Sequence, residues 1–177
     1  MINEAFLFAK QVHENQVRKN GVAYLVHPFE VAVILAQNGA CEELICAGLL
    51  HDAIEDADVT EEELRQRFPD KVVQLILDDS EDKSKSWEER KEEDIRFVAT
   101  TEDRDYKMLM CADKLANIRG LVIEQARRGE DVWKMFHRGK DKQEWFYRSM
   151  AAALSDLAGL PMYEELKEKI DTVFKKA

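Results

Sequence analysis

Leu49-Leu50-His51-Asp52-Ala53-Ile54-Glu55-Asp56-Ala57-Asp58 is the stretch around which this chain of 177 residues can be interpreted. It places a histidine and several acids at the end of a helical segment that is otherwise apolar from Leu44 onward. Such a helix should be buried, where charged groups are costly unless they are paired or bind a metal. His51 and Glu55 are four residues apart, as are Asp52 and Asp56, so a helix brings these side chains together. The stretch therefore predicts a buried polar cluster that suits a cation.

The rest of the chain has helical periodicity and helical start signals, and no segment reads as a convincing strand pair. Thr60 and Ser86 each precede a glutamate by three residues, which is the capping-box pattern at the start of a helix. The run from Asp78 to Lys85 has mixed charge and is expected to be a solvated loop. Helices are expected over 2–12, over 29–37 behind Pro28, from about 42 through the His51 stretch, after Thr60, over 72–77, after Ser86, over 106–119, over 142–157 and over 163–174. The predicted fold class is therefore all-α.

The composition favours one domain. Hydrophobic residues make up 45% of the chain, which is enough for one sizeable core. We expect a single domain over residues 1–177, with a motif-bearing core at about 6–121 and a helical completion over 122–177. No run approaches a membrane span, and the first residues lack a basic region followed by an apolar run, so neither insertion nor secretion is expected. Three cysteines without CxxC spacing fit reduced thiols in the cytoplasm.

The charge balance limits the classes of partner. A net charge of −10 argues against general affinity for nucleic acid or for an anionic membrane. An anionic small molecule would need a local cluster of cations, or a metal, to overcome that field. The sequence leaves the oligomeric state open.

Two further polar residues interrupt apolar segments. His27 precedes Pro28 at a helix entrance, and Asp113 lies amid Met, Cys and Leu, with Asn117 four residues on. Together with His51 and Asp52 they make two imidazoles and two carboxylates, a set that suits Mn²⁺, Fe²⁺, Co²⁺ or Zn²⁺. The set has no thiolate and leaves coordination positions for water and substrate. It therefore favours one catalytic divalent metal over a structural zinc site.

Three separated blocks carry a family resemblance. They read Arg18-Lys19-Asn20-Gly21-x-x-Tyr24-Leu25-Val26-His27-Pro28, His51-Asp52-x-x-Glu55-Asp56-x-Asp58-x-Thr60 and Ala112-Asp113-Lys114-Leu115-x-Asn117-Ile118-Arg119. In this order they resemble the HD-domain metal-dependent phosphohydrolases, and more closely the hydrolase domain of RelA/SpoT-type proteins and their small stand-alone relatives. The resemblance implies a multi-helix HD-domain bundle.

The resemblance also implies roles for these residues. The implied ligands of one Mn²⁺-like ion are His27, His51, Asp52 and Asp113. Glu55 and Asp56 are implicated in activating or orienting the attacking water. Arg18 is placed against the purine base and Asn117 on the nucleotide, and further substrate contacts are expected in the loop that holds Lys19, Asn20 and Tyr24. The implied reaction is hydrolysis of the 3′-pyrophosphate of (p)ppGpp to GDP or GTP and pyrophosphate.

Two rival functions and two alternative residue roles stay open. One rival is another HD-type nucleotide phosphohydrolase, such as a 5′-nucleotidase or a phosphatase of a phosphorylated dinucleotide. The other is a non-catalytic module that binds alarmone, against which the intact ligand set and the Glu55-Asp56 pair count. Asn117 has the alternative role of orienting Asp113 through its amide. His13 is interpreted as a packed or solvated residue.

Overall fold

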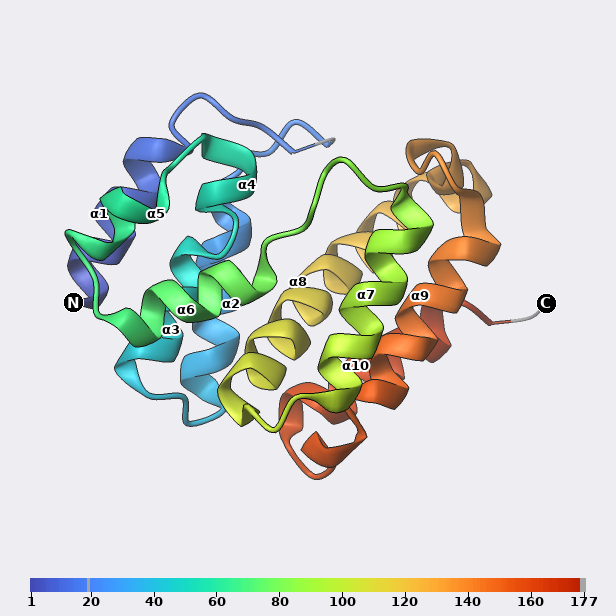
Figure 1. Cartoon of the computed structure of the whole chain (residues 1–177). Coiled ribbons are helices and arrows are strands. Elements are labelled where there is room, and N and C mark those ends of the chain that lie inside the picture. The colour runs from blue at the N-terminus through green and yellow to red at the C-terminus, as the bar shows by residue number, and fades with distance from the viewer. Residues whose placement is uncertain (19, 176–177) are drawn as a thin grey trace.

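The computed structural model describes residues 1–18 and 20–175 and is built from helices (Figure 1). Within these residues the β-structure is limited to an isolated bridge between Val17 and Ala23. The helices are α1 (Ile2–Val12), α2 (Val26–Gln37), α3 (Glu42–Leu50), α4 (Ala53–Ala57), α5 (Glu61–Arg65), α6 (Asp70–Asp79), α7 (Trp87–Thr100), α8 (Arg104–Arg128), α9 (Gly139–Ala153) and α10 (Pro161–Val173), with 3-10 turns at Gly129–Met135 and Ser155–Leu157. The all-α prediction is confirmed. No helix in this part of the chain is long and apolar enough to cross a bilayer.

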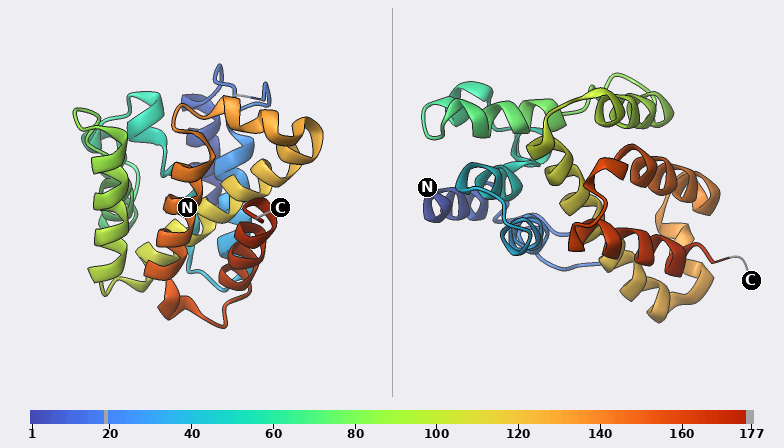
Figure 2. Two further views of the ribbon diagram at one scale, coloured as in Figure 1. Left: turned by 90° about the vertical axis from the view of Figure 1, so that its right-hand side faces the viewer. Right: turned by 90° about the horizontal axis from the view of Figure 1, so that it is seen from below.

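The 25-residue helix α8 lies between the two halves of the molecule. It packs against α2 and α3 on one side and against α10 on the other (Figure 2). Its middle turns are apolar, and Leu109, Cys111 and Leu115 are fully buried. Asp113 lies among them and is also buried, so a carboxylate is held where the halves meet.

Helices α2 and α3 cross unusually closely. Gly48 lies at the crossing, and a Cβ atom added there would be 2.6 Å from Leu35 Cδ1 and 3.3 Å from Val31 Cγ1. Real Cβ atoms do not approach other atoms so closely, so a side chain at position 48 would force the Leu35 side chain or one of the helices to move. The two helices are joined by a short loop, and this arrangement brings the start of α2 beside the end of α3.

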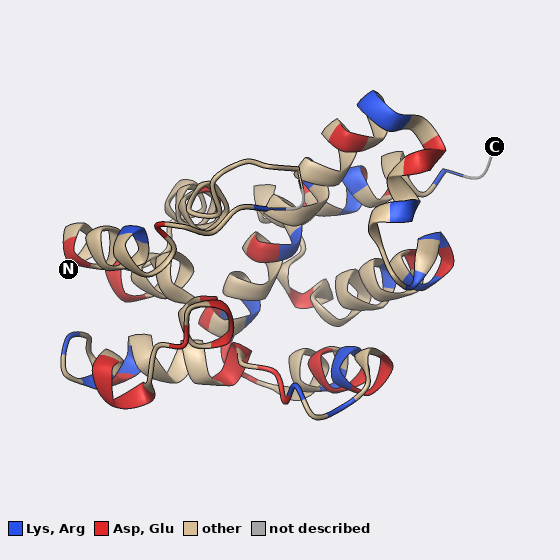
Figure 3. Ribbon diagram, turned by 90° about the horizontal axis from the view of Figure 1, so that it is seen from above, with Lys and Arg blue, Asp and Glu red and all other residues tan. Residues whose placement is uncertain are grey.

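Charged residues cover the outer surfaces of the helices. Figure 3 shows Lys and Arg interspersed with Asp and Glu along the ribbons. Several ion pairs join residues one helical turn apart, such as Arg65 with Glu61 and Arg148 with Glu144, each at 2.8 Å. Such exposed pairs contribute little to stability individually, so burial of the apolar faces must account for most of it.

The predicted capping boxes are both present. The Thr60 hydroxyl accepts the Glu63 amide at 3.2 Å, and the Glu63 carboxylate accepts the Thr60 amide at 2.9 Å. Ser86 and Glu89 make the same reciprocal pair at 3.3 and 2.9 Å. These bonds satisfy amides that have no partner in the first turn of a helix, which is why α5 and α7 begin where the sequence predicts.

The prediction of one continuous helix through His51 is wrong, because α3 ends at Leu50 and a separate helix, α4, begins at Ala53. The ring of His51 turns back and bonds the carbonyl of Gly48, which helps to end α3 there. The predicted loop at 78–85 is also too long, because α6 continues to Asp79 with a Gln74–Asp78 side-chain bond on its surface. Other ends differ from the predicted ones by a few residues, except that α8 runs nine residues past Arg119.

Candidate metal centre and adjacent acids

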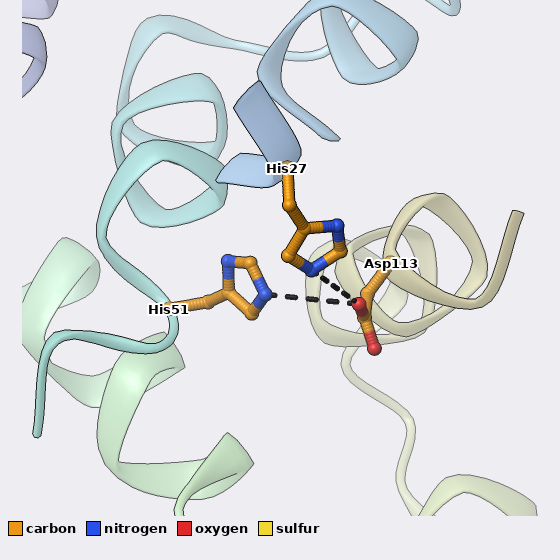
Figure 4. Close-up of side chains that lie close together, drawn as sticks. All are labelled: His27, His51 and Asp113. Atoms are coloured by element: carbon orange, nitrogen blue, oxygen red, sulfur yellow. Dashed lines mark ion pairs between the residues drawn. The ribbon is translucent and has the colours of Figure 1, made fainter. Parts of the chain in front are cut away.

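Four side chains converge at the junction of three helices. His27 comes from the first turn of α2, His51 from the turn after α3, and Asp113 from the middle of α8 (Figure 4). Asp52 follows His51 in the same turn. His27 Nε2 lies 3.0 Å from Asp113 Oδ1, and His51 Nε2 lies 3.7 Å from the same oxygen. Asp52 Oδ2 is 3.6 Å from His27 Nε2 and 3.2 Å from His51 Nε2. All four residues predicted to bind metal therefore lie together.

The geometry of the cluster fits a metal ion. His27, His51 and Asp113 each offer one ligand atom, and these atoms lie within 4.8 Å of one another. His51 Nδ1 lies 3.0 Å from the Gly48 carbonyl, which can only accept, so Nδ1 carries a proton and Nε2 has the lone pair in the neutral ring. His51 Nε2 is buried and has no hydrogen-bond partner among the described residues. A buried nitrogen lone pair without a donor is the arrangement that a metal ligand requires.

Both carboxylates of the cluster are held in the charged form. Burial alone would raise the pKa of Asp113, but Lys114 and the two histidines outweigh it and hold that pKa well below its usual value. Lys114 Nζ lies 2.6 Å from Asp113 Oδ2, which leaves Oδ1 facing the imidazoles. Burial likewise raises and the histidines lower the pKa of Asp52, with a net decrease. The same two carboxylates outweigh burial and raise the pKa of His51 well above its usual value. The site therefore places two anionic carboxylates beside two imidazoles, a strongly negative environment for a cation.

Arg18 is connected to the cluster through Asn117. Asn117 Nδ2 donates to Asp113 Oδ1 at 2.7 Å, and Asn117 Oδ1 accepts from Arg18 Nη2 at 2.7 Å. Both ends of the amide are occupied, which fits the alternative in which Asn117 orients Asp113. Asn20 Oδ1 accepts the Val22 amide of its own loop at 3.2 Å. Lys19 lies outside the described residues.

Tyr24 links the cluster to the neighbouring acids of α4. Its hydroxyl lies 2.7 Å from Asp52 Oδ2 and 2.6 Å from Asp56 Oδ2. The ring stacks on buried His13, with centroids 4.9 Å apart and planes at 29°. Burial and the two carboxylates raise the pKa of Tyr24, so the phenol stays neutral. One hydroxyl thus holds Asp56 beside a candidate ligand.

Glu55 is held from a distant part of the chain. Its Oε1 accepts the backbone amide of Glu81 at 2.5 Å, and its carbonyl oxygen accepts from the Lys83 ammonium. Burial raises the pKa of Glu55, partly offset by the Glu81 bond. A raised carboxylate pKa suits a general base. The prediction that this connection is merely solvated is wrong for Glu81, whose side chain is 13% exposed. Lys83 is exposed as predicted, although its ammonium reaches the Glu55 carbonyl.

Two residues near the site were not singled out in the sequence. Asp79 ends α6, and burial raises its pKa to about 7. Asp79 follows Val72, Leu75 and Ile76 at helical spacing, so its place on the apolar face was a usable signal. Glu81 lies in a run of mixed charge, where no periodicity marks it.

Replacing Tyr24 with phenylalanine is expected to weaken divalent-ion binding about 10- to 100-fold, the usual effect of losing a partner of a ligand. The ring can still stack on His13, so the change removes only the hydroxyl. Isothermal titration with Mn²⁺ measures the affinity. Tyr163→Phe is the matched control, because that hydroxyl donates to the Ala151 carbonyl at 3.0 Å, away from the site. Equal affinities for the two variants would contradict the role of Tyr24.

Comparisons with known proteins agree with this geometry. A family model described as HD domain matches residues 5–142. A guanosine-3′,5′-bis(diphosphate) 3′-pyrophosphohydrolase of Aquifex aeolicus is 35% identical over 135 residues, which are 75% of this chain and 19% of that protein. A GTP pyrophosphokinase of Streptomyces coelicolor is 32% identical over 182 residues, covering 96% of this chain and 20% of the relative. The chain thus spans about a fifth of the length of these curated relatives.

Two solved structures match the fold over most of their own length. The crystal structure of lmo0812 from Listeria monocytogenes EGD-e has a TM-score of 0.80 and 36% identity, covering 85% of this chain and 99% of that chain. A metazoan ortholog of SpoT that hydrolyzes ppGpp has a TM-score of 0.76 and 27% identity, covering 98% of this chain and 93% of that chain. The similarity therefore extends past the motif blocks into the C-terminal helices.

Proposed function

This chain belongs to the HD-domain family, and we propose that it is a metal-dependent hydrolase that removes the 3′-pyrophosphate of (p)ppGpp. The products would be GDP or GTP and pyrophosphate. Support comes from the metazoan ortholog of SpoT, a ppGpp hydrolase that this chain matches over 98% of its length. The relative from Aquifex aeolicus is named for the same reaction.

The observation that carries the proposal is the bridge made by Tyr24. Its hydroxyl contacts Asp52 of the ligand cluster and Asp56 of the acid pair, at 2.7 and 2.6 Å. A hydrolase of this type needs an ion to bind the phosphoryl oxygen and a carboxylate beside it to receive the proton of water. The bridge supports both roles within one site.

We propose that His27, His51, Asp52 and Asp113 hold a single divalent ion. The mixed nitrogen and oxygen donors suit Mn²⁺, Fe²⁺, Co²⁺ or Zn²⁺, and the resemblance to RelA/SpoT-type hydrolases favours Mn²⁺ among them. Such an ion supplies Lewis-acid polarisation of the phosphoryl group and lowers the pKa of nearby water. Glu55 would receive the proton of the attacking water on Oε2, because Oε1 is occupied by the Glu81 amide. Asp56, fixed by Tyr24, would orient that water.

The loop before α2 is the proposed nucleotide contact. Arg18 is fixed by Asn117 beside the centre, and its guanidinium is suited to stacking on a purine base. Lys19 would compensate phosphate charge, while Asn20 and Tyr24 would shape the loop. Asn117 would contact the nucleotide or act through Asp113.

We also place the protein in the cytoplasm. All three cysteines are free thiols, and Cys46 and Cys111 are buried. Burial raises the pKa of Cys46 to about 11 and that of Cys111 to about 12. Thiols held in this protonated form are unreactive and suit a reducing compartment.

The deciding experiment is hydrolysis of ppGpp with added Mn²⁺, in which GDP and pyrophosphate are both quantified. Asp52→Ala serves as the control for metal dependence. Release of both products by the wild type alone is the expected result. If the enzyme hydrolysed other nucleotides but not ppGpp, the substrate assignment would change from ppGpp to those nucleotides. Binding of ppGpp without turnover of any substrate would favour the non-catalytic module.

A further inference from the structure

Residues 80–86 connect α6 to α7 and cross the molecule next to α4 (Figure 1). The Glu81 amide donates to Glu55 Oε1 at 2.5 Å, and the Lys83 ammonium donates to the Glu55 carbonyl. Lys83 Nζ also lies 3.8 Å from Asp56 Oδ1. We call residues 80–86 the clasp. It contacts both the side chain and the backbone of Glu55.

Helix α4 is held by contacts from several parts of the chain: Gln16 donates to the Asp56 carbonyl, and Ile54 and Ala57 pack against the core. It has five residues, and Ala53 is the buried one among them. A helix this short is not stable by its own hydrogen bonds, so its orientation depends on tertiary contacts. The clasp and Tyr24 provide those contacts on the side of the acids.

The other end of Glu81 is anchored to α7. Its carboxylate lies 2.6 Å from Arg90 Nη1 and also pairs with the Lys91 ammonium. Glu81 and Lys91 side chains are each 13% exposed, so this pair is shielded from water. Lys91 also bonds Asp94 at 3.0 Å and lies 5.0 Å from the ring centroid of Phe146 in α9. Glu81 therefore connects the α7–α9 layer to Glu55 through a single residue.

We propose that Glu81 is a positioning residue for the hydrolysis, acting through Glu55. Its carboxylate fixes the clasp on α7, and its amide then holds Glu55 Oε1 so that Oε2 faces the water. The proposal rests on the proposed function, because it assumes that Glu55 receives the proton. A displacement of about 1 Å in a reacting group costs up to about 100-fold in rate. Loss of the anchor should therefore slow turnover without affecting the ion.

The test is Glu81→Gln, which keeps the backbone amide and the side-chain size but removes the charge that Arg90 and Lys91 bind. We expect kcat for ppGpp at saturating Mn²⁺ to fall about 10- to 100-fold. KM and Mn²⁺ affinity should stay within about twofold, because no ligand or nucleotide contact changes. Hydrogen–deuterium exchange of residues 53–57 should become faster, since the clasp no longer restrains α4.

Glu93→Gln is the matched control. It breaks another ion pair between the same connection and the same helix, that of Lys85 with Glu93 at 2.8 Å, but this pair is exposed and does not involve Glu81. Its kcat and its exchange at 53–57 should match the wild type. Arg90→Gln should reproduce part of the Glu81→Gln effect. The double variant Glu81→Gln/Arg90→Gln should be no slower than Glu81→Gln alone, because both changes remove one interaction.

Two results would overturn the proposal. One is an unchanged kcat in Glu81→Gln with unchanged exchange at 53–57. The other is an equal loss of kcat and of thermal stability in Glu81→Gln and Glu93→Gln, which would indicate a merely structural role. A wild type that does not hydrolyse ppGpp would overturn the proposed function and the catalytic part of this inference, and hydrogen exchange would still decide whether Glu81 holds α4.

Discussion

Asp113→Asn is expected to lower ppGpp hydrolysis by about 10³-fold or more. Oδ1 of Asp113 faces both imidazoles, and an uncharged amide there cannot hold a divalent ion in the same way. A metal contributes several kcal/mol to phosphoryl transfer, and each 1.4 kcal/mol is about tenfold in rate. The substitution also removes the negative charge that lies 2.6 Å from buried Lys114, which should reduce the free energy of unfolding by about 3 kcal/mol. Steady-state kinetics, Mn²⁺ titration and urea unfolding measure the three effects.

Asp156→Asn is the control for the loss of stability. Asp156 pairs at 2.7 Å with Lys107, which like Lys114 is a mostly buried lysine of α8. This variant should lose stability but keep the hydrolysis rate and the Mn²⁺ affinity. If Asp113→Asn bound Mn²⁺ as tightly as the wild type, Asp113 would not be a metal ligand.

The second large effect is expected for Glu55→Gln, which should lower kcat by about 10²- to 10⁴-fold. Glutamine can still accept the Glu81 amide on its carbonyl oxygen, so α4 should stay in place. It cannot receive a proton from water. Mn²⁺ affinity and KM should therefore change little, and kinetics at saturating Mn²⁺ separates these quantities.

Asp58→Asn controls for the loss of one negative charge beside the site. Asp58 follows α4 with a φ of 54°, a backbone conformation that asparagine also adopts readily. Its kcat should be close to that of the wild type. If Glu55→Gln raised KM and left kcat unchanged, Glu55 would be a substrate contact and not the base.

Much of this structure was predictable because the sequence marks it locally. The capping boxes at Thr60 and Ser86 gave two helix starts, and apolar periodicity gave most of the others. His27, His51 and Asp113 were identified because each interrupts an apolar segment, where a charge or an imidazole needs a partner. The structure brings these three together from distant parts of the chain.

The contacts that hold the acids were not predictable in the same way. Glu81 reaches Glu55 across 26 residues, and Arg18 reaches Asn117 across 99. Neither pair has a local spacing that distinguishes it from ordinary surface charge. The break between α3 and α4 was also hidden, because no proline interrupts residues 42–57 and the contact that helps to end α3 is made by the side chain of His51.

The close crossing at Gly48 has a consequence for ion selectivity. The rings of His27 and His51 are 5.2 Å apart between centroids, and their helices are α2 and the end of α3. A Cβ atom at position 48 would lie 2.6 Å from Leu35 Cδ1, so the Leu35 side chain or the helix that carries it would have to shift. Ligand distances differ among ions, from about 2.0 Å for Zn²⁺–N to about 2.3–2.6 Å for Ca²⁺–O. We therefore expect a side chain at position 48 to change the size of ion that the proposed centre accepts, through an apolar contact with Leu35 and through Gly48 itself, whose carbonyl bonds the His51 ring.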